Sequence, residues 1–170
     1  VLGGERLSTA QMQRIASELN LSETTFPLFG GDECRAAGAD YRLRIFTPEV
    51  EVPFAGHPSI GTAWLLREEG LVEADGGRFV QLCGAGALPV RFDGSRLTLT
   101  GGSPTWSDAV DPGVVLAAAG LNADASAGPA LVCGTGLPFA IQPVRDEALV
   151  CSAADLSVLR SRDFLALGTD

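Results

Sequence analysis

Residues 50–70 read VEVPFAGHPSIGTAWLLREEG, and this stretch decides the expected fold. Pro58 favours the first position of a helix, and Gly70 favours the position just past its end. Apolar side chains cover almost the whole circumference of the first turns: Ile60, Ala63, Trp64, Leu65 and Leu66. A helix that is apolar all round is typical of a buried helix. The stretch therefore predicts a short helix enclosed by a sheet, with Trp64 in the core.

The N-terminus of this helix opens at Ala55-Gly56-His57, just before Pro58, and is the main chemical feature of the sequence. Free backbone N–H groups and the positive end of the helix dipole favour a carboxylate or a developing oxyanion there. His57 is the only histidine among the 170 residues, and an imidazole can change its charge near neutral pH. Two interpretations stay open at this point, a functional histidine and an ordinary residue at a helix start.

The residues before this helix alternate between helical and strand patterns. A capping box of Ser8 and Gln11, followed by an apolar stripe, predicts a helix over 7–20. Alternating runs predict strands over 22–29, 41–46 and 49–52, and the stretch between the first two, 30–38, is expected to be a loop.

Three charged residues of these strands have two interpretations each. Glu23 lies where the helix gives way to the strand, and is either a solvated surface carboxylate or a catalytic group. Arg42 and Arg44 share one strand face, and either bind an anion or form ion pairs on a solvated surface.

The residues after the helix predict more strands and then a change of domain. Strands are expected over 78–82, 88–92 and 97–99, with Asp93-Gly94 as the turn of a hairpin. Turn-forming residues make 103–111 the best linker between a first domain, 1–102, and the beginning of a second, 112–170. Within the second we expect helices over 112–119 and 152–162 and strands over 130–133 and 139–144.

Several long strings resemble one known family. PFAGHPSIGTAW (53–64), LNLSETTF (19–26) and YRLRIFTPEVEVPFAGHP (41–58) are similar to the signature of the PhzF-like (phenazine-biosynthesis F) proteins. The barrels of that family are similar to those of diaminopimelate epimerase. The resemblance thins after Gly102, where GTGLPFAIQPV (134–144) is its clearest part. It implies an α+β fold: an antiparallel, barrel-like sheet around a buried helix, lacking its first strand, and the start of a second such domain.

The resemblance also implies an isomerase without cofactor or metal. Glu23 would take a proton from a small carboxylated substrate and return it elsewhere, while His57 and Gly56 steady the developing charge. Ser22, Pro58 and Ser59 would join Gly56 in binding the substrate. A homodimer, a cytoplasmic location and a role in secondary metabolism also follow from the resemblance. The alternative is an inactive small-molecule-binding fragment or remnant of such an enzyme.

Composition excludes some functions and leaves the completeness of the chain open. A formal net charge of −9 argues against a nucleic-acid partner, and no apolar run is long enough to span a membrane.

The four cysteines lack metal-ligand spacing, so reduced thiols in the cytoplasm are expected. Cys133 begins a CGTG string similar to the one that carries a catalytic cysteine in diaminopimelate epimerases. Those epimerases use two catalytic cysteines, and Gly56-His57 occupies the position where the first of them should be.

We expect Val1–Asp170 to belong to a longer chain, or to be covered by a partner.

Overall fold

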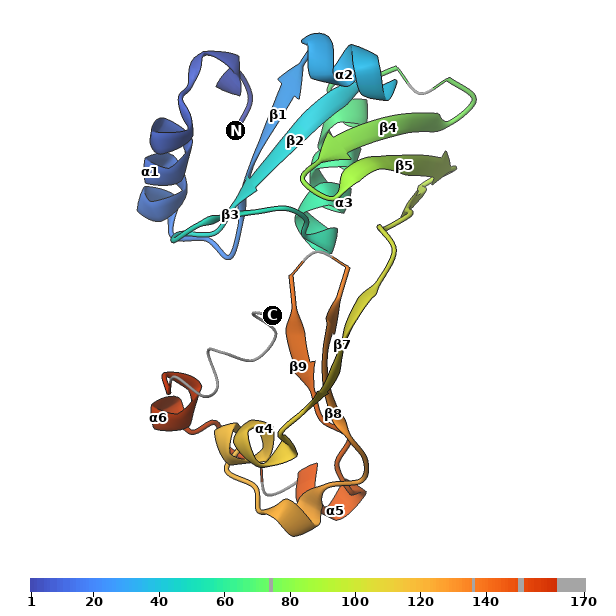
Figure 1. Ribbon diagram of the computed structural model, residues 1–170. Helices are drawn as coiled ribbons and strands as arrows, with labels where there is room; N and C mark the ends of the chain where they lie inside the picture. Colours follow the sequence, from blue (N-terminus) through green and yellow to red (C-terminus); the bar gives the residue numbers. More distant parts are fainter. Residues whose placement is uncertain (74, 136, 150–151, 162–170) are drawn as a thin grey trace. The chain divides into compact units, whose positions relative to one another are not determined.

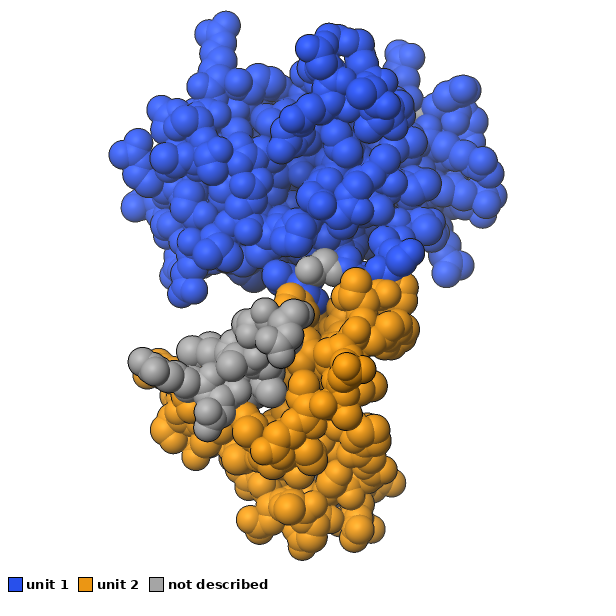
Figure 2. Space-filling model, in the orientation of Figure 1, with its two compact units in different colours: residues 1–103, 135–137 blue, residues 104–134, 138–170 orange. Residues whose placement is uncertain are grey.

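The computed structural model describes residues 1–73, 75–135, 137–149 and 152–161 (Figure 1). The chain divides into two compact units, one of residues 1–103 and 135–137 and the other of residues 104–134 and 138–170 (Figure 2). Within the described residues, no helix is both long and apolar enough to cross a membrane. The first unit carries the residues on which the functional expectations depend.

An open, six-stranded sheet organises the first unit. Its strands are β1 (Thr24–Phe29), β2 (Tyr41–Phe46), β3 (Glu51–Val52), β4 (Arg78–Cys83), β5 (Gly86–Asp93) and β6 (Arg96–Leu99). The strand order is β1-β2-β4-β5-β6, with β3 paired to β2. The helical segments η1 (Gly4–Arg6) and α1 (Thr9–Leu19) precede β1, whereas α2 (Asp32–Ala37) joins β1 to β2 and α3 (Gly56–Glu68) joins β3 to β4. The expected α+β class is therefore confirmed, although the described strands form no closed barrel.

The β2–β4 pair is parallel, whereas the other pairs are antiparallel. Parallel neighbours need a long crossover connection, usually a helix, and α3 supplies it between β2 and β4. The expectation of a wholly antiparallel sheet is corrected in this one pair. Because α3 is the crossover helix, its position on the sheet is set by the strands before and after it.

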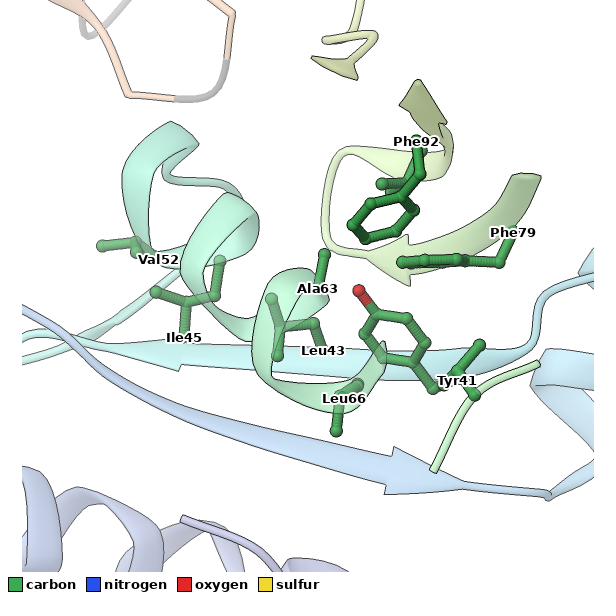
Figure 3. Packing of buried hydrophobic residues seen from close by; sticks show 10 residues of the cluster. Tyr41, Leu43, Ile45, Val52, Ala63, Leu66, Phe79 and Phe92 are labelled. Atoms are coloured by element: carbon green, nitrogen blue, oxygen red, sulfur yellow. The ribbon is translucent and has the colours of Figure 1, made fainter. Parts of the chain in front are cut away.

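Each face of β1 and β2 packs against a different helix. Tyr41, Leu43 and Ile45 join the core under α3, together with Ala63 and Leu66 of the helix (Figure 3). The opposite face packs against α1 in a second cluster that contains Met12, Ala16, Phe26 and Phe46. Alternate side chains of a strand point to opposite faces of a sheet, so β2 contributes to both cores.

The expectation that α3 is buried all round is wrong. Its buried residues are Ser59, Thr62, Ala63 and Leu66, which follow helical spacing along one face. Trp64 is 52% exposed, and Ile60 and Leu65 are also exposed. The sheet is open and covers α3 from one side only, so the uniform apolar composition of the helix does not bury its other side. The helix also begins at Gly56, two residues before the predicted Pro58, and Gly70 follows its end with φ 63°.

Two further segments differ from the expectations. The expected loop over 30–38 contains α2, whose first turn carries Asp32 and Glu33 and whose C-cap residue, Gly38, has φ 60°. The expected linker over 103–111 contains the strand β7 (Thr105–Val110), which pairs with β8 (Ala130–Gly134). Pairing with a distant strand overrides the turn-forming composition there, and local patterns do not reveal it.

The second unit is a three-stranded sheet with short helices. Its strands lie in the order β7-β8-β9, the last being β9 (Phe139–Ile141). The helical segments are α4 (Pro112–Ala118), η2 (Ala123–Ala125), α5 (Asp146–Leu149) and α6 (Leu156–Leu159). The helix expected over 152–162 is therefore shorter. Asp155 caps it by accepting from the N–H groups of Ser157 and Val158, and Arg162 lies outside the described residues.

Two adjacent glycines before β4 predict different responses to substitution. Both have positive φ, 56° at Gly76 and 77° at Gly77. A Cβ on Gly77 would lie 2.8 Å from the carbonyl oxygen of Phe92, whereas a Cβ on Gly76 meets nothing within 4 Å. We expect Gly77→Ala to lower the free energy of unfolding by about 2–3 kcal/mol and Gly76→Ala by about 1 kcal/mol. Denaturant titration checks this; equal losses at both positions would contradict the clash.

Candidate active site

Glu23 lies immediately before β1, the strand that packs against both α1 and α3. Its side chain is 18% exposed, so the surface-carboxylate interpretation does not describe it. Strand alternation places Glu23 on the same side as Thr25, whose hydroxyl contacts Thr62 of α3. The carboxylate therefore projects toward α3, the helix that begins with Gly56, His57 and Pro58.

The N-terminus of α3 has backbone donors with no side-chain cap. Its N-cap residue, Ala55, is extended with φ −147° and provides no capping oxygen. Pro58 has no N–H group, and the N–H of Ser59 donates to the carbonyl of Ala55 at 3.3 Å. The N–H groups of Gly56 and His57 thus remain as first-turn donors at the positive end of the helix dipole.

Glu23 and His57 meet at this helix start. The distance between Glu23 Oε2 and His57 Nε2 is 3.1 Å, while the His57 side chain as a whole is 75% exposed. Glu23 Oε2 is nevertheless buried without a hydrogen bond from any described residue. A distance of 3.1 Å without a hydrogen bond means that no N–H of the ring points at the carboxylate oxygen. The contact is therefore a close approach of the two groups, and it becomes an ion pair when His57 is protonated. A buried carboxylate oxygen with no donor costs stability, and such exceptions often belong to functional sites.

The other predicted binding residues are placed differently by the structure. Ser22 is exposed and Pro58 is half-buried, so both can be reached from solvent beside Glu23 and His57. Ser59 is fully buried, and its hydroxyl accepts a hydrogen bond from Gln81 Nε2 at 3.1 Å. Its side chain therefore faces the core, because the fourth residue of α3 is the first on the face that packs against the sheet.

The two strand arginines form ion pairs. Arg44 holds Glu51 through two hydrogen bonds of 2.7 and 2.6 Å, and the hydrogen bonds to Glu51 raise the pKa of Arg44. Arg42 pairs with Glu33 of α2. Of the two interpretations left open by the sequence, the structure supports ion pairing.

The cysteines that the structure describes are free thiols. Within the described ranges, no group of three or more His, Cys, Asp or Glu residues could hold a metal ion. Cys34 and Cys83 are buried free thiols, and burial raises the pKa of both, which suits unreactive structural residues. Cys133 is a free, half-buried residue of β8, and Cys151 lies outside the described residues.

Among curated relatives, two share long similar regions with this chain. A trans-2,3-dihydro-3-hydroxyanthranilate isomerase of Pseudomonas aeruginosa is 41% identical over 121 residues, which cover 68% of this chain and 40% of that protein. The "antisense-enhancing sequence 1" protein of Schizosaccharomyces pombe is 44% identical over 92 residues, 54% of this chain and 30% of its own length. The matched regions span less than half the length of either relative.

A solved structure and a family match agree with these relatives. The PhzF-family phenazine biosynthesis protein of Bacillus anthracis superposes with a TM-score of 0.71 at 27% identity, covering 92% of this chain and 53% of that one. Residues 1–155 match the family described as phenazine biosynthesis-like protein, PhzC-PhzF. The family expected from the sequence strings is confirmed, and the chain belongs to the PhzC-PhzF family of phenazine biosynthesis-like proteins.

Proposed function

We propose that the protein is an isomerase that moves a proton between two carbon atoms of a small carboxylated substrate without a cofactor. One observation carries the proposal: the buried Glu23 Oε2 accepts no hydrogen bond from the described residues and lies 3.1 Å from His57 Nε2. A carboxylate oxygen with a free lone pair can accept a proton from a substrate carbon. The uncapped start of α3 beside it can hold the negative charge that this transfer creates.

The reaction that this geometry supports has two proton transfers. The substrate carboxylate binds the N–H groups of Gly56 and His57, and Glu23 removes a proton from a nearby carbon. The electron pair left behind spreads into the conjugated system toward the bound carboxylate, where the helix dipole and the His57 side chain stabilise it. Glu23 then returns the same proton to another carbon. No atom or electron is gained or lost, and the carboxylate of Glu23 is regenerated.

The curated relatives indicate a substrate class. The Pseudomonas aeruginosa relative is named for trans-2,3-dihydro-3-hydroxyanthranilate, which is a small ring with a carboxylate and fits the charge of the α3 N-terminus. We therefore propose this compound or a close analogue as the substrate, and we expect a cytoplasmic protein that forms a homodimer. An inactive binding protein of the same family would bind such a carboxylate without converting it.

The experiment that tests this proposal measures conversion with and without a chelator. We expect the full-length protein to convert trans-2,3-dihydro-3-hydroxyanthranilate to an isomer of equal mass. The conversion is monitored by NMR. Dialysis against EDTA should leave the rate within about twofold, because a carboxylate and a histidine carry the proton chemistry. Binding of the compound with no conversion would favour the inactive alternative. A rate lost on dialysis and restored by a divalent cation would contradict the cofactor-free mechanism.

A further inference from the structure

The buried face of α3 carries two polar side chains, Ser59 and Thr62. Each makes a side-chain hydrogen bond to a different strand: Ser59 to Gln81 of β4, and Thr62 to Thr25 of β1. The Thr25 Oγ1 to Thr62 Oγ1 distance is 2.8 Å. This second bond is the one that joins the strand next to Glu23 to the helix that carries His57.

The threonine pair joins the two elements that carry the candidate site residues. Thr25 follows Glu23 by two residues, so both side chains lie on the same side of the extended chain. Thr62 lies five residues after His57 in the same helix. A displacement of β1 against α3 would therefore change the Glu23–His57 distance directly, and the threonine pair is placed to resist it.

Packing alone does not explain why hydroxyl groups occupy these two positions. Valine has nearly the same shape as threonine, suits a strand at least as well, and would bury apolar surface on α3 without a polar group. Apolar contact is also non-directional, whereas a hydrogen bond between two hydroxyls favours one distance and one relative position. The pair thus supplies positional definition that an apolar pair would lack.

We propose that Thr25 and Thr62 are positioning residues that hold Glu23 at its working distance from His57. The inference rests on the proposed isomerase function for its effect on rate, while its structural part concerns the Glu23–His57 contact itself. Substrate binding depends on the N–H groups of α3, which the pair does not contact. Loss of the pair should therefore slow proton transfer and leave substrate affinity unchanged.

Kinetics of Thr62→Val and Thr62→Ser in the full-length protein provide the first test. We expect Thr62→Val to lower kcat about tenfold with KM within about twofold, because small misplacements of a catalytic group are costly. Thr62→Ser keeps the hydroxyl and should restore most of kcat. Thr25→Val should match Thr62→Val, and the double variant should be no slower than either, as expected when two residues act through one contact.

Tyr41→Phe is the matched control for a purely structural role. Tyr41 is fully buried in the core under α3, and its hydroxyl donates to Gln81 Oε1 at 3.0 Å. Its removal deletes a buried hydrogen bond without touching Thr25, Thr62 or the Glu23–His57 pair. We expect kcat within about twofold of wild type in this variant. An equal loss of kcat in Tyr41→Phe and Thr62→Val would overturn the positioning role.

The NMR signals of the His57 ring test the same inference without turnover. The ring signal, assigned by its loss in His57→Gln, should shift when Glu23→Gln removes the neighbouring charge. Thr62→Val should shift it in the same direction, and Thr62→Ser and Tyr41→Phe should leave it in place. If Glu23→Gln retains full turnover while Thr62→Val still shifts the signal, the catalytic proposal fails and the positioning inference stands. An unshifted signal and an unchanged kcat in Thr62→Val would overturn the inference.

Discussion

Replacing Glu23 with glutamine should lower turnover by at least about a hundredfold, the usual scale for loss of a general acid or base. The amide has the shape of the carboxylate but cannot accept the substrate proton. The N–H groups of Gly56 and His57 remain in place at the start of α3, so substrate affinity should stay within a few-fold of wild type. Steady-state kinetics together with calorimetric binding of the substrate measure the two quantities separately.

Glu68→Gln is the matched control for this substitution. Glu68 is an exposed residue at the last position of α3, so the same change of net charge occurs on the helix that carries His57, but at its opposite end. We expect its turnover to be close to that of wild type. Turnover of Glu23→Gln within a few-fold of wild type would show that Glu23 does not carry the proton. An equal loss in both variants would trace the effect to net charge.

Truncation of Phe26 to alanine should lower the free energy of unfolding by about 3–5 kcal/mol, as is usual for large aromatic residues in a core. Phe26 is fully buried in the cluster between β1 and α1. Its ring packs edge-on against Phe46 with a centroid distance of 5.5 Å, so the substitution removes an aromatic contact as well as apolar burial. Denaturant titration of the 170-residue chain measures the loss.

Trp64→Ala provides the comparison that separates burial from size. If Trp64 lay in the core, as the sequence predicts, its truncation would cost about 3–5 kcal/mol, the value for a buried aromatic residue. With 52% of Trp64 exposed, the expected loss falls to about 1 kcal/mol or less. If Trp64→Ala lowers the free energy of unfolding as much as Phe26→Ala does, Trp64 is buried and not exposed on α3.

Local signals in the sequence determined several elements correctly. The Ser8–Gln11 capping box forms both of its hydrogen bonds at the start of α1. Asp93-Gly94 turns the chain between β5 and β6, where Asp93 pairs with Arg96. Both signals act between residues near one another in the chain, so nearby sequence suffices to specify them. For Glu23, in contrast, residue types left two interpretations open, the family resemblance implied a role in proton transfer, and its contact with His57 came only from the structure.

Only the tertiary structure decided which surfaces meet. An apolar helix such as α3 can be covered on one side or on all sides, and here an open sheet covers the side of Ser59, Thr62, Ala63 and Leu66 while Trp64 stays exposed. The inward turn of Ser59 toward Gln81 and the contact of Thr25 with Thr62 likewise join strands and helix across long stretches of sequence. Periodicity specifies the shape of one element, but the neighbour of a side chain depends on how the elements pack, and short patterns do not contain that information.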